Sequence, residues 1–226
     1  MTDQIRADQI RADQIRADQI RADIVRTAAS LFERGLTPGS SGNISVRLPD
    51  NGFLMTPTNV SMGDLDPARL SHFDATGQQI AGDPPTKEAF LHFAMYDQRP
   101  DARAVIHLHS PHATAISILR NTDPADVLPP LTAYYVMRVG RLPLVPYFPP
   151  GDAALAEAVR ALAKTHHAVL LANHGPVVAG TSLANAQFAV EELEETARLF
   201  LMLHNHPTRS LTPDQVADLR QRFNLT

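Results

Sequence analysis

Two histidines two positions apart, His107 and His109, give the first indication of chemistry in this sequence. They stand in residues 104–110, Ala-Val-Ile-His-Leu-His-Ser, where the alternation of side chains predicts a β-strand. Because successive side chains of a strand point to opposite faces, Val105, His107 and His109 should share one face. Two imidazoles placed in this way can bind one metal ion, although strand histidines also occur packed or solvated without one.

A third histidine, His174, follows an apolar segment at residues 168–171 that predicts a buried strand. Three neutral imidazoles around an ion leave one coordination position open, which a catalytic divalent metal needs. We therefore predict a metal site formed by His107, His109 and His174. Four other histidines are predicted to make ordinary hydrogen bonds or to face solvent: His92, His112, His204 and His206.

Two polar turns and one carboxylate complete the set of candidate functional groups. Residues 39–45 (Gly-Ser-Ser-Gly-Asn-Ile-Ser) and 56–59 (Thr-Pro-Thr-Asn) offer hydroxyls, amides and backbone N–H groups to an anion. The same residue types also form ordinary hairpin turns. Thr86 is the predicted N-cap of a helix that extends to about Arg99, and Glu88 lies in its first turn. A carboxylate at that position can do chemistry or simply complement the helix dipole.

Composition narrows the class of protein that carries these groups. The 226-residue chain has a net charge of -4, which gives no reason to expect nucleic acid or an anionic membrane as a partner. It contains no cysteine, so disulfides and thiolate metal ligands are excluded. No apolar run is long enough to span a bilayer. We expect a cytoplasmic protein.

The chain begins with an unusual repeat. Residues 3–22 are four copies of Asp-Gln-Ile-Arg-Ala, a composition that favours helix. Each copy advances a helix by about 140° beyond a full turn, so successive isoleucines spiral around the axis and form no apolar stripe. We expect residues 1–22 to be a helical or frayed extension and residues 23–226 to be a single catalytic domain. The alternative is that the repeat is an assembly device.

The remaining elements alternate along the chain without a regular strand–helix rhythm. Short strands and turns are predicted up to residue 85, and helices and strands alternate after that. Residues 134–137 (Tyr-Tyr-Val-Met) favour an extended conformation, and Ser182 is the predicted N-cap of the longest helix.

From about residue 24 onward the chain resembles the class II aldolase/adducin family. Five short motifs carry the resemblance: Ser41-Gly-Asn43, Thr56-Pro-Thr58, Pro85-Thr-Lys-Glu88, His107-Leu-His109 and Asn173-His-Gly175. The resemblance implies an α/β protein with a three-layer α/β/α fold around a largely antiparallel sheet. It also implies a homotetramer with active sites between subunits.

The resemblance assigns roles to the metal and to its surroundings. It implies that His107, His109 and His174 bind a divalent metal, zinc first and manganese or cobalt as alternatives. Glu88 would be the acid or base and also a ligand. Burial beside the substrate is expected to raise the pKa of Glu88, so that the group can carry a proton.

Further residues would hold a phosphorylated substrate and supply a second proton donor. The resemblance implies that six residues surround the phosphate: Asn43, Ser45, Thr58, Asn59, Thr86 and Lys87. Lys87 is expected to contact either the phosphate or a departing carboxylate. A tyrosine from a neighbouring subunit, Tyr135 in preference to Tyr134, would reach the site.

Within this family the sequence resembles the 3-oxo-tetronate 4-phosphate decarboxylases, in runs such as residues 128–135 and 172–180. This likeness implies a carboxy-lyase that converts a four-carbon sugar-acid phosphate into dihydroxyacetone phosphate and carbon dioxide through a metal-stabilised enediolate. Sugar-phosphate aldolases usually carry Pro-Thr-Gly and Ser-Ser-Glu where this chain has Pro-Thr-Asn and Thr-Lys-Glu, which disfavours simple aldolase activity. The alternatives are a fuculose- or ribulose-phosphate type aldolase or epimerase, and a non-catalytic interaction module like adducin.

Overall fold

One mixed sheet organises the fold. The computed structural model describes residues 2–149 and 151–225, with side chains described from residue 14 onward. Within these residues, eight strands pair in the order β4-β3-β2-β1-β5-β8-β7-β6. All neighbouring strands are antiparallel except β6 and β7, so the prediction of a largely antiparallel sheet is confirmed. The strands are β1 (Asn43–Arg47), β2 (Phe53–Met55), β3 (Ser71–Phe73), β4 (Gln79–Ala81), β5 (Ala104–His107), β6 (Leu144–Val145), β7 (Ala168–Leu171) and β8 (Pro176–Gly180).

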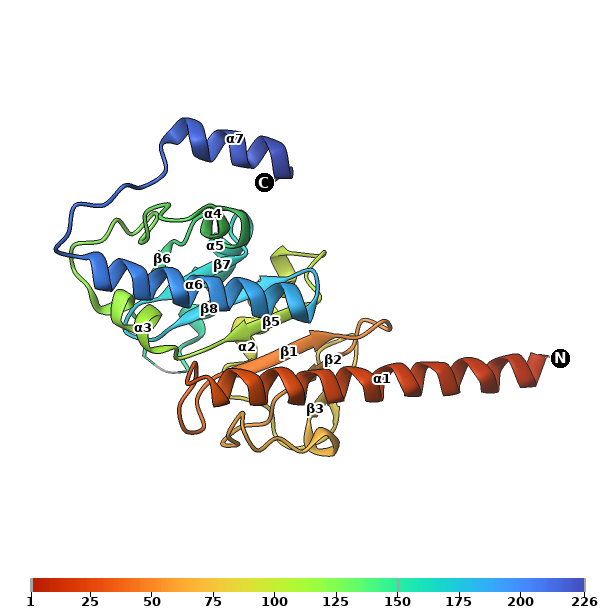
Figure 1. Ribbon diagram of the computed structural model, residues 1–226. Helices are drawn as coiled ribbons and strands as arrows, with labels where there is room; N and C mark the ends of the chain where they lie inside the picture. The colour runs from red at the N-terminus through yellow and green to blue at the C-terminus, as the bar shows by residue number, and fades with distance from the viewer. Residues whose placement is uncertain (1, 150, 226) are drawn as a thin grey trace.

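Helices cover both faces of the sheet and make it the middle of three layers, as Figure 1 shows. One outer layer holds α2 (Ala89–Gln98) and α5 (Ala153–Ala163), which pack on each other. The other layer holds α1 (Thr2–Glu33), α3 (Pro111–Ile118) and α6 (Leu183–Leu203). The remaining helices are α4 (Ala133–Arg138), α7 (Pro213–Phe223) and the 3-10 turn η1 (Pro67–Arg69). No described helix combines the length and the apolar character needed to cross a membrane.

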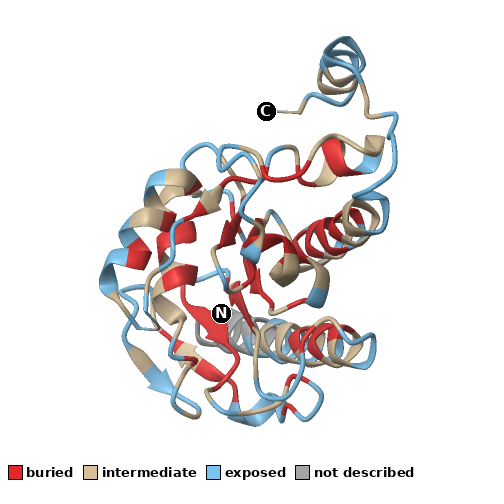
Figure 2. Cartoon of the chain, turned by 90° about the vertical axis from the view of Figure 1, so that its left-hand side faces the viewer, coloured by how far each residue is buried: buried red, intermediate tan, exposed pale blue. Residues whose placement is uncertain are grey.

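The alternation of side chains along β5 decides which layer each residue meets. Ala104 and Ile106 pack into the core beneath α1 and α6, whereas Val105 packs into the core beneath α2 and α5. Figure 2 shows buried residues concentrated in the sheet and on the helix faces that turn toward it. His107 therefore lies on the face covered by α2 and α5. It is fully buried there.

Two helix boundaries differ from the sequence-based expectation. Residues 134–137 are helical within α4, because the hydroxyl of Thr132 accepts a hydrogen bond from the backbone N–H of Tyr135 at 3.0 Å and caps the helix. Helix α2 begins at Ala89 and not directly after Thr86. Residues 86–88 form a turn in which the hydroxyl of Thr86 accepts the N–H of Glu88 at 3.3 Å.

Helix α1 runs without interruption from the repeat into the body of the protein. Ile15 is 61% exposed, whereas Ile20 packs against the core and Ile24 is fully buried. The guanidinium of Arg21 donates a hydrogen bond to the carbonyl of Pro67 at 3.0 Å. Contact with the body therefore includes the last copy of the repeat.

This difference between copies can be tested with two deletions. Removing residues 3–17 should leave the free energy of unfolding within about 0.5 kcal/mol, because the described part of that segment is solvent-exposed. Removing residues 3–22 also takes away Ile20 and Arg21, and should cost about 1 kcal/mol, or about 2–4 °C in Tm. Thermal unfolding and size-exclusion chromatography of both variants measure the effect. A smaller oligomeric state of the shorter deletion than of the parent protein would support the assembly role and contradict this expectation.

Candidate active site

Four side chains converge at the end of β5: Glu88, His107, His109 and His174. Each offers one ligand atom, and these atoms lie within 4.8 Å of one another. The Nε2 atom of His107 is 3.2 Å from that of His109 and 3.3 Å from that of His174, and the last two are 2.9 Å apart. The carboxylate of Glu88 is 3.1 Å from Nε2 of His174 and 3.4 Å from Nε2 of His107. The structure thus brings together the three histidines and the glutamate that the sequence singled out.

This donor set fits a divalent cation. The Nδ1 atom of His107 donates to the carbonyl of Pro176 at 2.9 Å, so in the neutral ring Nε2 carries a lone pair directed at the other imidazoles. Lone pairs facing one another need a cation or a proton between them. Tetrahedral bonds of about 2.0–2.1 Å to zinc separate two ligand nitrogens by about 3.3–3.4 Å, close to the spacing found here.

Two of the three histidines, His107 and His109, are disposed to be neutral, which is the form that binds metal. Burial lowers the pKa of His107 to about 4, although the adjacent Glu88 carboxylate works in the opposite direction. Burial, together with the neighbouring His174, also lowers the pKa of His109 below its ordinary value. At neutral pH these two rings can offer lone pairs without first losing a proton.

The partners of Glu88 set its pKa in the free protein. Burial pushes its pKa upward, but His107, His174 and the amide of Asn43 outweigh burial and hold the pKa below the ordinary value. The Nδ2 atom of Asn43 donates to Oε2 of Glu88 at 2.9 Å. The expectation of a raised pKa concerns Glu88 desolvated beside the substrate and stays a prediction; in the free protein, partners from distant segments lower the pKa of the carboxylate. Glu88 is ionised at neutral pH.

Close backbone packing brings His174 to the strand histidines. Asn173 adopts a left-handed conformation with φ of 57°, which turns the chain immediately after β7. A Cβ atom on Gly175 would lie 2.1 Å from the carbonyl oxygen of Leu108, so only glycine allows this approach. The hydroxyl of Thr114 in α3 donates to the carbonyl of His174 at 2.8 Å and fixes the turn.

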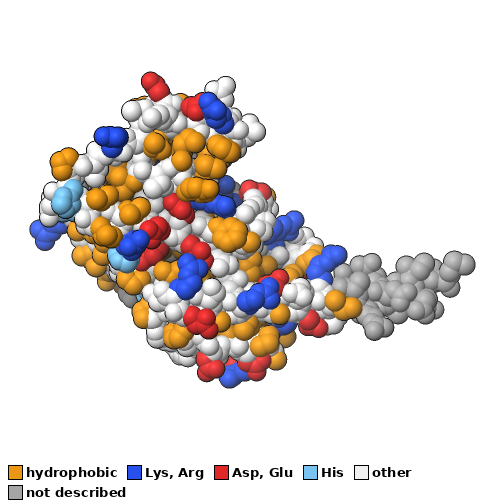
Figure 3. Space-filling model, viewed as in Figure 1, with side chains coloured by type: hydrophobic (Ala, Val, Ile, Leu, Met, Phe, Trp, Pro, Cys, Tyr) orange, Lys and Arg blue, Asp and Glu red, His pale blue; other side chains and the backbone are white. Residues whose placement is uncertain are grey.

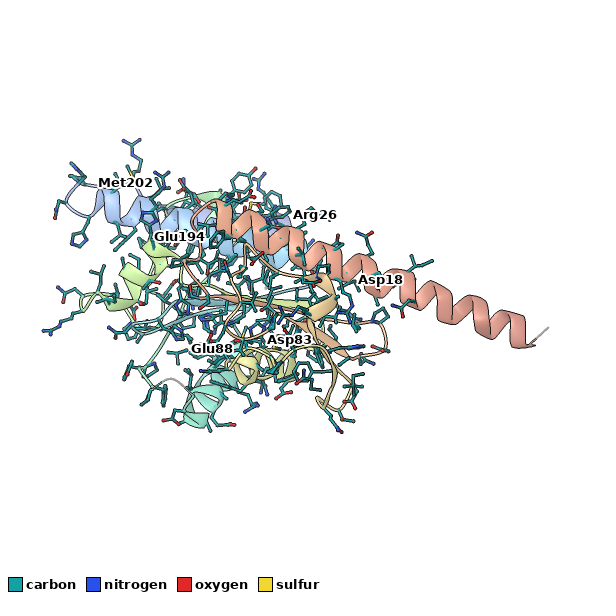
Figure 4. The ribbon with its side chains drawn as sticks, turned by 90° about the horizontal axis from the view of Figure 1, so that it is seen from below. Asp18, Arg26, Asp83, Glu88, Glu194 and Met202 are labelled. Carbon is teal, nitrogen blue, oxygen red and sulfur yellow. The ribbon has the colours of Figure 1, made fainter. Side chains whose placement is uncertain are left out.

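Two cavities of about 410 Å³ each meet at the four-residue cluster and share Glu88 and His109. The first is mainly apolar, and its lining includes Phe90, Pro146, Tyr147, Phe148, Leu155 and Leu171. The second, here called the polar cavity, is the more polar of the two, and its lining includes Ser40, Ser41, Gly42, Asn43, Thr58, Asn59, Thr86 and Lys87. Figure 4 shows Glu88 beside α2, with Glu194 of α6 in the opposite layer.

The polar cavity contains five of the six residues predicted to surround a phosphate, and Ser45 is the exception. The hydroxyl of Ser45 is fully buried and bonds to His92 and Tyr96 beneath the site. Ser45 does share the strand face of Asn43, but it lies deeper under α2. The prediction that Ser45 contacts substrate is therefore wrong. Ser40 and Ser41 line the cavity instead, and their position in the glycine-rich turn was the signal that marked them.

The two candidate tyrosines differ sharply in accessibility. Tyr135 is 1% exposed, its hydroxyl is enclosed without a hydrogen-bond partner among the described residues, and burial raises its pKa. Tyr134 is 62% exposed on the surface of α4. Burial in the core of its own chain prevents Tyr135 from reaching a neighbouring subunit, so the expected preference for Tyr135 over Tyr134 is reversed.

The histidines predicted to have ordinary roles lie outside the cluster. His112 donates a backbone hydrogen bond to the buried Glu194, and its ring contacts the same carboxylate at 2.8 Å. His92 is completely buried and hydrogen-bonded. His204 and His206 are exposed at the end of α6.

Comparison with known proteins identifies relatives of this chain. The model of the family described as Class II Aldolase and Adducin N-terminal domain matches residues 22–201. A curated relative from Escherichia coli strain K12, 3-oxo-tetronate 4-phosphate decarboxylase, is 49% identical over 195 residues, which cover 86% of this chain and 92% of the relative.

Two further comparisons extend the relationship. The crystal structure of YgbL from Escherichia coli superposes with a TM-score of 0.88 at 46% identity, covering 90% of this chain and 99% of YgbL. L-fuculose phosphate aldolase from Escherichia coli strain K12 is 33% identical over 201 residues, covering 87% of this chain and 90% of the aldolase.

The metal site can be tested by matched substitutions. We expect His174→Ala to abolish stoichiometric binding of a divalent metal, because it removes one of three converging ring nitrogens. His206→Ala is the control, since it removes an exposed histidine outside the cluster. Elemental analysis of both purified proteins after dialysis against each of zinc, manganese and cobalt measures the effect. Full metal content in the His174→Ala protein would refute the assignment.

Proposed function

The chain belongs to the class II aldolase and adducin N-terminal domain family, and on that premise we propose that it is a metal-dependent carboxy-lyase. The proposed substrate is 3-oxo-tetronate 4-phosphate, and the products are dihydroxyacetone phosphate and carbon dioxide. The observation that carries the proposal is the four-residue donor cluster at the meeting point of a polar and an apolar cavity. The 49% identity to a decarboxylase across 92% of that relative supports the reaction type.

The polar cavity suits the phosphate of this substrate. Its hydroxyls and amides, including Ser40, Thr58 and Asn59, can donate hydrogen bonds to phosphate oxygens. Lys87 is exposed and lines the same cavity, so we assign its ammonium group to the phosphate and not to the departing carboxylate. The phosphate would anchor the substrate so that its carbonyl carbon lies over the cluster.

The apolar cavity suits the carboxylate that leaves the substrate as carbon dioxide. A carboxylate placed near Phe90 and Phe148 would lose part of its hydration, whereas the neutral carbon dioxide that leaves would not. The bond between the carboxylate carbon and its neighbour breaks, and the electron pair remains on that neighbouring carbon. His107, His109 and His174 would hold a divalent ion, for which zinc is the first candidate. This ion would polarise the adjacent ketone oxygen and stabilise the developing negative charge.

A proton must then reach the carbon that lost carbon dioxide. Glu88 is ionised in the free protein, but the negative charges of an approaching substrate oppose its own charge and raise its pKa. In the complex Glu88 can therefore take a proton from solvent and deliver it to carbon. Its hydrogen bond from Asn43 keeps the carboxylate in place before and after the transfer.

Tyr134 is the second proton-donor candidate, and it requires a neighbouring subunit. Figure 3 shows hydrophobic side chains gathered over α4 and α6, and the exposed members of these helices are Tyr134, Phe188, Met202 and Leu203. Apolar surface of this kind is typical of subunit interfaces. We propose a cytoplasmic homotetramer in which Tyr134 of one subunit reaches the site of another.

The alternative activity is cleavage of a sugar phosphate, as the name of the aldolase relative at 33% identity suggests. Both reactions leave negative charge beside a ketone, and they differ in the group that departs. Carbon dioxide release from 3-oxo-tetronate 4-phosphate and aldehyde release from L-fuculose 1-phosphate should be measured in parallel, with metal and with chelator. Turnover of the second substrate alone would overturn the decarboxylase proposal. The intact donor cluster argues against a purely structural module.

Glu88→Gln should lower kcat by roughly 10²–10⁴-fold, the usual contribution of a positioned acid or base. Glutamine retains the size and hydrogen-bonding capacity of the side chain and removes only the titratable group. KM should stay within a few-fold, because the substitution leaves Thr58, Asn59 and Lys87, which hold the phosphate, unchanged. Carbon dioxide release under saturating substrate measures kcat, with Glu157→Gln as an exposed control. A Glu88→Gln protein with the parent kcat would show that another group delivers the proton to carbon.

The two tyrosines make a second matched pair. Tyr134→Phe should lower kcat by roughly 10²-fold without a change in stability, because it removes one proton donor from an exposed position. Tyr135→Phe should leave kcat unchanged, because its hydroxyl is enclosed and makes no hydrogen bond. The same carbon dioxide assay decides between them. A slow Tyr135→Phe enzyme and a fast Tyr134→Phe enzyme would restore the original sequence-based preference.

A further inference from the structure

A chain of buried polar side chains lies beneath the site and ends on Glu88. The hydroxyl of Tyr96 is 2.9 Å from the hydroxyl of Ser45, which is 2.7 Å from Nδ1 of His92. Nε2 of His92 is 2.5 Å from Oδ1 of Asn43, whose amide nitrogen contacts Oε2 of Glu88. Ser45 and His92 have no exposed surface, and Tyr96 and Asn43 are each 3% exposed. Polar groups buried this completely depend on one another for hydrogen bonds.

The carboxylate fixes the direction of every hydrogen bond in this chain. The amide nitrogen of Asn43 donates to Glu88 at 2.9 Å and to the hydroxyl of Thr86 at 3.1 Å, which leaves the amide oxygen facing His92. Nε2 of His92 must then donate to that oxygen. The ring is neutral because burial lowers the pKa of His92 to about 3, so Nδ1 accepts from Ser45. The oxygen of Ser45 in turn accepts from Tyr96.

The opposite direction is excluded by electrostatics. If His92 carried its hydrogen on Nδ1, its Nε2 would accept, and the amide of Asn43 would have to rotate so that nitrogen faced the ring. The amide oxygen would then face the ionised carboxylate of Glu88, and two acceptors would be in contact. Leaving a buried amide and a carboxylate unpaired in this way costs several times a normal hydrogen bond.

We propose that His92 is a positioning residue, whose Nε2–H holds the Asn43 amide in the orientation that places Glu88 for proton transfer. This proposal rests on the proposed function only in giving Glu88 its role, because the hydrogen-bond directions hold whatever the reaction is. Within the described residues the ring of His92 bonds to Ser45 and Asn43, and His92 lines neither cavity, so it acts on the site through Asn43. One oxygen of Glu88 is thereby held by Asn43, and the other oxygen faces His174 at 3.1 Å.

Two substitutions separate this role from a merely structural one. In His92→Gln the side-chain amide stands near the place of Nε2 and can still donate to Asn43. In His92→Asn the amide stands near the place of Nδ1, where it can bond to Ser45 but cannot reach Asn43. Each variant loses one of the two ring hydrogen bonds, so their Tm values should be similar. We expect kcat of His92→Asn to fall roughly 10–100-fold, the usual effect of losing a partner one step from the reacting group.

The difference in kcat between the two variants tests the proposed role of His92. For His92→Gln, kcat should stay within about threefold of the parent, and KM should change by no more than a few-fold in both variants, because Thr58, Asn59 and Lys87 of the polar cavity stay in place. Crystal structures should show the Asn43–Glu88 hydrogen bond retained in the Gln variant and lost in the Asn variant. Equal kcat values in the two variants, or an intact Asn43–Glu88 contact in His92→Asn, would overturn the proposal.

A measurement on the unaltered protein avoids dependence on variants that fail to fold. Nitrogen NMR of protein labelled at histidine should show His92 as the neutral tautomer with hydrogen on Nε2, and the missing signal in His92→Gln assigns it. Hydrogen on Nδ1 would overturn the proposal. If the parent protein releases no carbon dioxide but this tautomer is found, the proposed function fails while the hydrogen-bond chain stands.

Discussion

The register of β5 between β1 and β8 is the constraint on which the site depends. In this register His107 lies opposite Asn43 on one side and Val177 on the other. Because side chains alternate along a strand, a slip of one residue would turn His107 toward α1 and α6 and would separate it from Asn43 and Glu88. The apolar residues of β5 hold the register. After a slip, Ile106 would leave the core beneath α1 and α6 and Val105 would leave the core beneath α2 and α5, so both would lose their packing partners. The register that packs both cores is therefore also the register that places the metal ligand His107.

The electrostatic character of the site follows from the same burial. The ionised carboxylate of Glu88 lies beside the neutral rings of His107 and His109, in a place where water cannot fully stabilise its negative charge. A divalent cation would neutralise this negative charge and leave the cluster with a net positive charge. A substrate that carries both a phosphate and a carboxylate complements that charge. The Lys87 ammonium adds a second positive group at the mouth of the polar cavity.

The sequence predicted the parts of the site that depend on local pattern. Period-two alternation placed His107 and His109 on one face, and the three-layer fold followed from the family resemblance. Alternation indicates the face of a strand but not the depth, which is why Ser45 was assigned to substrate although it lies under α2. In the same way, a six-residue helix is too short to show a period, so Tyr135 and Tyr134 could not be told apart until α4 was seen. The partners that lower the pKa of Glu88 come from distant segments, and no local pattern reveals them.

The continuous helix α1 has a consequence for how this chain can change over generations. Tandem copies of a short unit in a gene are gained and lost by slippage more readily than other sequences are altered. Each copy of Asp-Gln-Ile-Arg-Ala adds about 7.5 Å to a helix and rotates what lies beyond it. Among the side chains described from residue 14 onward, Ile20 of the copy nearest the body packs against the core, whereas Ile15 of the preceding copy is exposed. Gain or loss of outer copies should therefore be close to neutral for folding. The length of this segment is free to drift among close descendants while the catalytic domain stays fixed.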